Sequence, residues 1–276
     1  KADASIFVTG QEVLIDQPVK HFEQLTQMIP NLNWAGGSSR PRYFQIRGIG
    51  ERSGYEGTPN SSVGFIIDDI DFSGLGGIAT SFDLEQVEVH RGPQGLRMGA
   101  NALAGLIYMQ SKNPTDAFEG IAELVYGSDD IKSLGIAMGG PIDEEEKLKY
   151  RVAFRQDEVN GFRNNSWLAK DNTSGKKEFT GRIKLNWQPN STSTIDFLLM
   201  NVDLENGYDA WTMDNSLSTL SDKPGRDSQD TNAMGLKMRF RLHDKFELQS
   251  LTGLTHSDVL FSFDADWGNN QSWQPY

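Results

Sequence analysis

The chain has 276 residues, a net charge of −12 and no cysteine. The lack of cysteine excludes disulfide frameworks, Cys-ligated zinc sites and thiol catalysis, and the acidic excess argues against a nucleic-acid partner. No stretch of the sequence reaches the roughly 18 apolar residues that a membrane-spanning helix needs. Hydropathy alone does not exclude the membrane, because only every second residue of a transmembrane β-strand faces lipid.

The first part of the chain, residues 1–118, is rich in glycine and mixes helical and strand periods. Apolar residues at helical spacing predict a short helix over residues 20–29, which Pro30 ends because its ring blocks a further helical turn. Short strands bounded by Gly and Pro are predicted over 44–47, 63–68, 86–91 and 106–110. We therefore expect a small α+β domain.

From residue 119 the sequence alternates apolar with charged or polar residues. Strands are predicted over 119–126, 133–142, 147–157, 178–188, 193–204, 232–242 and 245–260. The apolar set expected on the outer, convex side includes Tyr150, Val152, Phe154, Ile183 and Leu185, and the set expected to point toward the first domain includes Lys149, Arg151, Arg182 and Lys184. Such alternation is typical of outer-membrane strands, although a soluble antiparallel sheet with one solvated face gives the same pattern.

The lengths of the predicted connections favour a membrane barrel. Short connections at 143–146, 189–192 and 243–244 contrast with long polar ones at 158–177 and 205–231, as in barrels with short turns on one side and long loops on the other. An open sheet edge in hydrocarbon would leave backbone groups unpaired. A barrel of about eight strands is filled by its own side chains, so it could not enclose the first domain. We therefore expect the chain to be the N-terminal portion of a longer protein.

Four motifs in a fixed order carry a family resemblance. They are Ile29-Pro30-Asn31-Leu32, the Phe44–Gly48 segment ending in Arg-Gly, the Val63–Asp71 segment, and the segment from Phe82 to Ser111 with its Arg91-Gly92-Pro93 turn. Together they resemble the plug domain of TonB-dependent outer-membrane transporters. The resemblance implies an α+β plug domain over 1–118, followed over 119–276 by antiparallel transmembrane β-barrel strands, about seven of an expected twenty-two.

The resemblance also implies a function. It is TonB-dependent active transport of a scarce nutrient, most often a ferric siderophore, across the bacterial outer membrane, with no enzyme activity and no cofactor. The implied partners are TonB with its inner-membrane energising complex, the small ligand and outer-membrane lipid. TonB would pair with a short N-terminal segment by strand addition; residues 1–10 contain no convincing one, so we expect it upstream.

Three alternatives remain open from the sequence. Members of the same family carry cobalamin, carbohydrates or aromatic compounds. A barrel enzyme would need a nucleophile, a base and an orienting group at its rim, and no such set is evident. A β-rich binding or adhesion protein is the third alternative.

Arg47 and Arg91 each precede a glycine at a predicted strand end. In the family the arginines of such Arg-Gly motifs pair with glutamates of the barrel wall, so the resemblance implies that both hold the plug in place, a task suited to bidentate bonding. Glu247 is a candidate partner. The plainer alternative is an arginine at a solvated strand end.

Ligand contacts are expected on the plug loops that face the outside. Arg40, Arg42 and Arg52 could bind an anionic ligand, and Tyr55 and Phe72 could offer flat surfaces to aromatic groups. Trp211 lies, with Tyr208 and Met213, in a long loop that is unusually apolar, which suggests contact with the ligand or the plug. Ordinary solvated loops are the alternative for each residue.

No metal site is predicted. Asp68, Asp69 and Asp71 cluster at a strand end, but they lack the spacing of a calcium-binding loop and are explained equally well as turn residues. Gly92, Gly95, Gly99 and Gly105 match no phosphate-binding spacing and are explained by backbone freedom. The four histidines are scattered.

Overall fold

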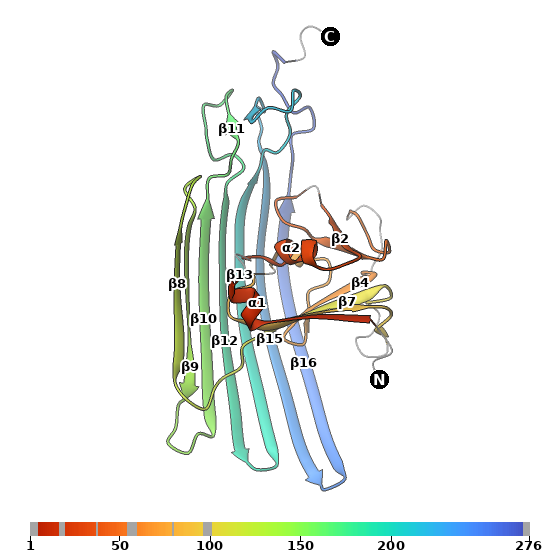
Figure 1. Cartoon of the computed structure of the whole chain (residues 1–276), viewed down its shortest axis with the longest axis vertical. Coiled ribbons are helices and arrows are strands. Elements are labelled where there is room, and N and C mark those ends of the chain that lie inside the picture. The colour runs from red at the N-terminus through yellow and green to blue at the C-terminus, as the bar shows by residue number, and fades with distance from the viewer. Residues whose placement is uncertain are drawn as a thin grey trace.

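The structure is a computed structural model that describes residues 5–16, 20–36, 38–53, 60–78, 80–95 and 101–272. A tall curved sheet of long strands carries a small domain against one of its faces (Figure 1). Among the described residues, no helix is long and apolar enough to cross a membrane.

The small domain is built around a five-stranded sheet in the order β1-β6-β7-β4-β5. Its strands are β1 (Ser5–Gly10), β6 (Leu84–Arg91), β7 (Gly105–Ser111), β4 (Val63–Ile67) and β5 (Ile70–Asp71). Neighbours pair antiparallel except β4 with β7, which are parallel. A separate hairpin joins β2 (Leu32–Ala35) to β3 (Tyr43–Ile46). The predicted α+β class is confirmed.

The helices of the small domain are short: α1 (Gln11–Asp16), α2 (Phe22–Leu25), and the 3₁₀ turns η1 (Thr26–Met28) and η3 (Gly76–Ile78). The helix predicted over 20–29 is α2 continued by η1. His21 caps α2, because its Nδ1 accepts from the Glu23 amide at 3.2 Å. The predicted helix tightens into a 3₁₀ turn where the Ile29 amide donates to the Thr26 carbonyl, one residue before Pro30.

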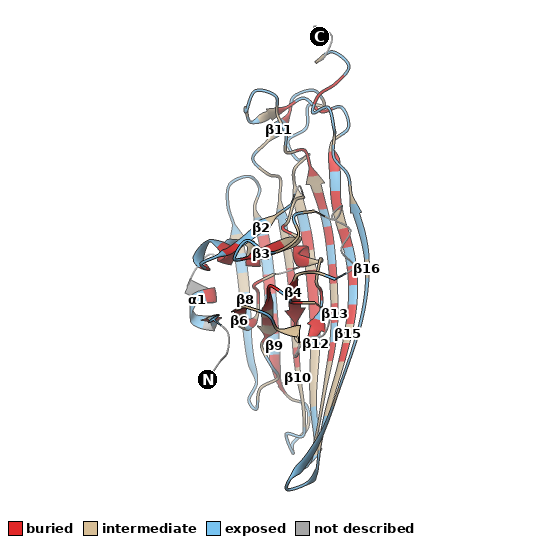
Figure 2. Cartoon of the chain, turned by 90° about the vertical axis from the view of Figure 1, so that its right-hand side faces the viewer, coloured by how far each residue is buried: buried red, intermediate tan, exposed pale blue. Residues whose placement is uncertain are grey.

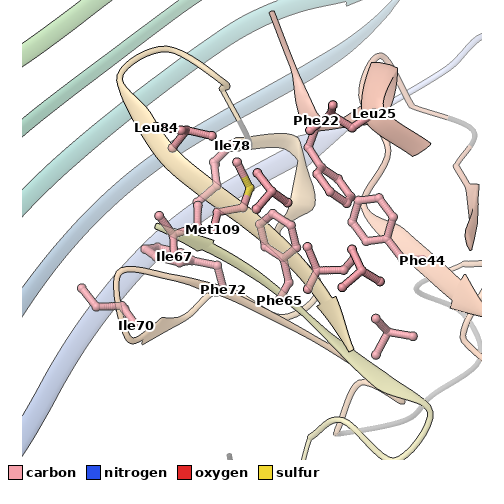
Figure 3. Close-up of a cluster of buried hydrophobic side chains, with 14 of the residues drawn as sticks. Phe22, Leu25, Phe44, Phe65, Ile67, Ile70, Phe72, Ile78, Leu84 and Met109 are labelled. Atoms are coloured by element: carbon pink, nitrogen blue, oxygen red, sulfur yellow. The ribbon is translucent and has the colours of Figure 1, made fainter. Parts of the chain in front are cut away.

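Aromatic rings form the centre of the small domain's core (Figure 3). The Phe22 ring meets Phe44 edge-on at a centroid distance of 5.2 Å, and Phe44 stacks on Phe65 at 5.6 Å. Gly105 lets β7 approach β6 closely, since a Cβ there would lie 2.3 Å from the His90 carbonyl oxygen.

The large sheet has seven antiparallel strands in the order β16-β15-β13-β12-β10-β9-β8. They are β8 (Glu119–Tyr126), β9 (Lys132–Pro141), β10 (Leu148–Val159), β12 (Lys176–Asn190), β13 (Ser193–Tyr208), β15 (Gly225–His243) and β16 (Phe246–Phe261). All seven predicted strands are confirmed. We call the end with the tight connections the turn end, and the opposite end the loop end. At the loop end β11 (Asn164–Asn165) pairs with β14 (Ser218–Thr219).

The largest departure from prediction is at the start of β15. The sequence predicts a loop there up to residue 231, but the strand begins at Gly225. Asp227, Gln229 and Thr231 are buried toward the small domain, whereas Ser228 and Asp230 alternate on the other face. Both faces are polar over this stretch, so the sequence carries no apolar alternation to reveal it.

The two faces of the large sheet differ as predicted. Arg151 and Arg182 are 3% and 4% exposed on the side of the small domain, while Phe154 and Ile183 are 43% and 37% exposed on the other side. Figure 2 shows the buried residues concentrated on the strands behind the small domain. On β15 the outward apolar residues run from Met234 to Leu242, about 27 Å along the strand at the rise of an antiparallel strand. At the tilt of outer-membrane strands this run would cover about 20 Å of a lipid-facing band that is about 25 Å tall.

Candidate functional site between the two sheets

The first cluster of contacts between the small domain and the large sheet centres on Arg40, in the loop after β2. Its guanidinium holds Glu178 of β12 with two hydrogen bonds, Nε to Oε1 at 2.7 Å and Nη2 to Oε2 at 2.6 Å. It also pairs with Glu23 of α2. Although burial opposes the charged form, the two carboxylates raise the pKa of Arg40 above its usual value, so this arginine is a permanent cation shared between domains.

A second part of the same cluster lies beside it on β15. Asp227 accepts hydrogen bonds from the Ser39 amide at 2.7 Å and hydroxyl at 2.6 Å, and pairs with Arg42. Asn206 of β13 joins the two parts, because its Nδ2 donates to Glu178 at 2.8 Å and to the Ser39 hydroxyl at 2.9 Å. We call the six residues Ser39, Arg40, Arg42, Glu178, Asn206 and Asp227 the loop-end clasp.

Phe82 fixes the small domain to β9 and β10 of the large sheet, nearer the turn end than the loop-end clasp. Its ring is 8% exposed and packs against Ala137 and Ala153. A Cβ at Gly135 would lie 2.7 Å from the ring, so only glycine leaves the required space there. The guanidinium of Arg155 lies 5.4 Å from the ring centroid, which adds a cation–π contact.

Asp83, the next residue, makes the most buried ion pair of the interface. Arg151 donates from Nε to Asp83 Oδ2 at 2.8 Å and from Nη2 to Oδ1 at 2.5 Å. Arg151 also holds Glu119 of β8 at 2.6 Å, and Arg182 donates to the Phe82 carbonyl. Asp83 has a left-handed backbone, with φ of 57°, a conformation that Asp tolerates better than most residues.

The turn between β4 and β5 makes the contacts nearest the turn end. Asp68 accepts from Lys184 at 2.9 Å, and Asp69 from Lys237 at 2.7 Å. Ile70, the next residue, packs beside Gly235, where a Cβ would lie 3.2 Å from its Cδ1. Both aspartates have positive φ, 48° and 67°, so their interpretation as turn residues is confirmed.

The charges across this interface are sorted along the strands. In the loop-end clasp the small domain supplies cations and the large sheet supplies anions. Nearer the turn end the small domain supplies Asp68, Asp69 and Asp83, and the large sheet supplies Lys184, Lys237 and Arg151. On β12 the sign changes between Glu178 and Lys184, about 20 Å apart at the usual rise per residue. An inverted or displaced small domain would therefore bring like charges together.

The structure confirms the predicted direction of the inward-facing bases. Arg151, Arg182 and Lys184 reach the small domain, and Lys149 pairs with Asp116 in the segment that joins β7 to β8. The partners Asp83, Glu178 and Asp227 were not predicted. The alternation of β12 does signal that Glu178 faces inward, but nothing in the sequence says which residue lies opposite, and Asp227 lies in a stretch without apolar alternation.

The predicted ligand residues fall in different surroundings. Phe72 is fully buried in the core of the small domain, so the prediction that its ring touches a ligand is wrong: the loop after β5 turns this side chain inward. Arg40 and Arg42 belong to the clasp, and Arg52 is exposed. Trp211 is 47% exposed and stacks on Trp267 with a centroid distance of 5.4 Å. Tyr55 lies outside the described residues.

Arg47 and Arg91 make no ion pair with the large sheet among the described residues. Arg47 is exposed with φ of 55°. Arg91 donates from Nη1 to the Pro30 carbonyl at 3.3 Å, and its buried Nε has no partner within the described parts of the chain. Glu247, the candidate partner, lies opposite Arg241 in the β15–β16 ladder. The gating role of Arg47 and Arg91 stays a prediction.

The acidic residues at the β4–β5 turn form no metal site in the described part of the chain, where no group of His, Asp or Glu is arranged to hold an ion. Asp71 accepts instead from the Ser73 hydroxyl at 2.5 Å and from Asn101 at 2.7 Å.

Comparison with known proteins identifies the small domain. Residues 1–106 match the family model of the TonB-dependent receptor plug domain. The pesticin receptor of Yersinia pestis is 24% identical over 188 residues, which are 68% of this chain and 27% of the receptor. The vitamin B12 transporter of Vibrio vulnificus is 27% identical over 104 residues, 38% of this chain and 17% of the transporter.

Solved structures share the whole arrangement. The ferric yersiniabactin uptake receptor FyuA from Yersinia pestis superposes with a TM-score of 0.83 at 20% identity, over 95% of this chain and 42% of that one. The pyoverdine receptor FpvA from Pseudomonas aeruginosa gives a TM-score of 0.73 at 18% identity, over 96% and 39% of the two chains. The chain thus spans less than half the length of these relatives. Residues 1–106 thus match the plug domain of TonB-dependent receptors, and the chain as a whole has the fold of these solved outer-membrane receptors.

Proposed function

We propose that the chain is the plug and the adjoining barrel wall of a receptor that takes up a scarce nutrient, most often a ferric siderophore, across the outer membrane with energy delivered through TonB. The observation that carries this proposal is the loop-end clasp. The two arginines predicted to meet an anionic ligand, Arg40 and Arg42, are the same two that tie the plug to Glu178 and Asp227. Ligand binding and plug release therefore share side chains.

The clasp explains how a ligand could prepare the plug for movement. An anionic chelate that reaches Arg40 and Arg42 competes with the wall carboxylates, and each exchanged ion pair removes a tie between plug and wall. A ligand shifts an equilibrium only by its differential affinity for the two states, and this exchange supplies such a difference. Arg52 and Trp211, both exposed, are proposed as contacts that hold the ligand meanwhile.

The relatives support the choice of cargo. FyuA is named for ferric yersiniabactin and FpvA for pyoverdine, whereas the Vibrio vulnificus relative is named for vitamin B12. The test is uptake of radiolabelled iron complexes and of cobalamin by iron-limited cells with and without the receptor that carries this chain. Uptake of one compound should disappear with the receptor, and also in cells that lack TonB. Uptake that persists without TonB would contradict the proposal.

A further inference from the structure

A polar cavity lies between the plug and the wall at the β4–β5 turn, on the turn-end side of the interface. Its volume is about 480 Å³, and both domains line it. The charged residues of its lining are Asp68, Asp69, Asp116, Lys149, Asp196, Lys184, Lys237 and Arg239. These groups therefore border one shared polar space.

The charges of the lining divide by domain. Asp68 and Asp69 belong to the plug and Asp116 to the segment that follows it, whereas all four described bases of the lining stand on wall strands. Asp196 is the one acid that the wall contributes to this lining, and it pairs with Arg239 at 3.4 Å. Without the plug and its joining segment, the described lining has four bases and one acid, a net charge of 4 − 1 = +3.

The β4–β5 turn fills this cationic surface with two adjacent carboxylates. Asp68 binds Lys184 and Asp69 binds Lys237 at 2.9 and 2.7 Å, so one short segment presents two negative charges to two ammonium groups. The side chain of Lys184 is 11% exposed and that of Lys237 is 30% exposed. Lysine is a compact point charge with three donors and no fixed geometry, which suits it to exchange one anion for another.

We propose that Lys184 and Lys237, with Lys149 and Arg239, form a transit site for an anionic cargo, and that the Asp68–Asp69 turn occupies this site while the plug is seated. When the turn leaves, an anion that passes between plug and wall meets these bases before it reaches the turn end. The physiological role of this site rests on the proposed uptake function, whereas its ability to bind anions does not depend on that function.

The ability of the site to bind anions is tested on the purified receptor that carries this chain. The double variant Asp68→Asn with Asp69→Asn removes the two resident carboxylates, and inorganic pyrophosphate, a small polyanion, is titrated against it. Pyrophosphate should bind this variant at least about tenfold more tightly than the wild type, in the range by which focused charge raises local ion concentration. Adding Lys184→Gln and Lys237→Gln should abolish the gain. Equal binding by the wild type and the double variant would overturn the proposal.

The physiological role is tested by uptake of the compound identified in the transport assay. Two double variants are compared, Asp68→Asn/Asp69→Asn and Lys184→Gln/Lys237→Gln. If the lysines only hold the plug, both variants break the same ion pairs and should lose the same uptake. If the lysines form a transit site, the aspartate double keeps uptake and the lysine double loses about tenfold in rate, with unchanged ligand affinity at the cell surface. Equal losses would overturn the transit role. A receptor with no uptake at all would refute the proposed function and leave the pyrophosphate result to decide the site.

Discussion

Asp83 of the plug and Arg151 of the barrel wall are joined by two hydrogen bonds of 2.8 and 2.5 Å, and their side chains are 2% and 3% exposed. This bidentate geometry is the strongest form of a charge-assisted pair. Because both side chains are buried away from solvent, the loss of either one leaves a buried charge with too few partners. The pair is therefore the point where the plug depends most on one wall residue.

We predict that Asp83→Asn weakens the docking of the plug by about 3 kcal/mol, the range for breaking a buried pair. The amide keeps the shape of the carboxylate but removes its charge, and Glu119 is then the one carboxylate that still pairs with Arg151 among the described residues. Hydrogen exchange of the β6 amides measures the loss. Lys177→Gln is the control, because Lys177 and Glu205 pair at 3.6 Å with side chains that are more than half exposed, and such pairs contribute under about 1 kcal/mol. Equal effects of the two changes would contradict the prediction.

The contact between Gly135 and Phe82 gives a steric prediction. A methyl group at Gly135 would lie 2.7 Å from the Phe82 ring, so Gly135→Ala should push the ring out of its pocket and cost about 1 to 3 kcal/mol of docking free energy. Gly120→Ala on the neighbouring strand is the control, since its Cβ would come no closer than 3.4 Å to another atom. The smaller ring-free side chain in Phe82→Leu should partly restore docking in the Gly135→Ala background. Failure of this rescue would mean that the clash is not the cause.

The sequence predicted the strands and their faces because alternation is a local property. Lys184 and Arg151 point inward for the same reason that Ile183 and Val152 point outward. Where both faces are polar, as from Asp227 to Thr231, the local signal vanishes, and the start of β15 was not predicted. The four plug motifs identified the family without any knowledge of contacts.

The partners across the interface could not be predicted, because they are far apart in the chain. Ser39 and Asp227 are separated by 188 positions, and Asp83 and Arg151 by 68. Which wall position lies opposite which plug loop depends on the strand register and on how the plug sits against the wall. Phe72 shows the same limit in another way: its ring lies in a segment expected to face the outside, yet its backbone directs it into the core.

The loop-end clasp predicts strong coupling between Arg40 and Glu178. Arg40→Ala leaves Glu178 and Glu23 without their shared cation, so the variant should lose about 3 kcal/mol of docking free energy. Arg40→Ala combined with Glu178→Gln should cost less than the sum of the single changes, because the second change removes the uncompensated charge. Hydrogen exchange of β3 and sensitivity of cells to large antibiotics both measure the result. Additive losses would show that the two residues act separately.

His21 predicts a dependence of plug stability on pH. Its Nε2 lies 3.1 Å from the Gly77 carbonyl and its Nδ1 accepts from Glu23, so the ring is held neutral with the proton on Nε2. Burial, and next the neighbouring Arg40, lower the pKa of His21 from 6.5 to about 4. Between these two values the unfolded plug binds more protons than the folded one, and stability must fall as the pH falls. We expect a loss approaching about 3 kcal/mol from pH 6.5 to 4, at 1.36 kcal/mol per pKa unit.

The variant His21→Asn tests this expectation, because an asparagine oxygen can still accept from the Glu23 amide at the N-cap without titrating. Urea unfolding of the plug, followed at several pH values between 4 and 7, should show a steeper loss of stability in the wild type than in the variant. Titrating groups away from His21 contribute equally to both proteins, so the difference between the two curves reports His21 together with its charged neighbours Glu23, Arg40 and Glu178. Parallel curves would show that His21 is protonated in the folded plug as readily as in the unfolded chain, and that the cap does not depend on a neutral ring.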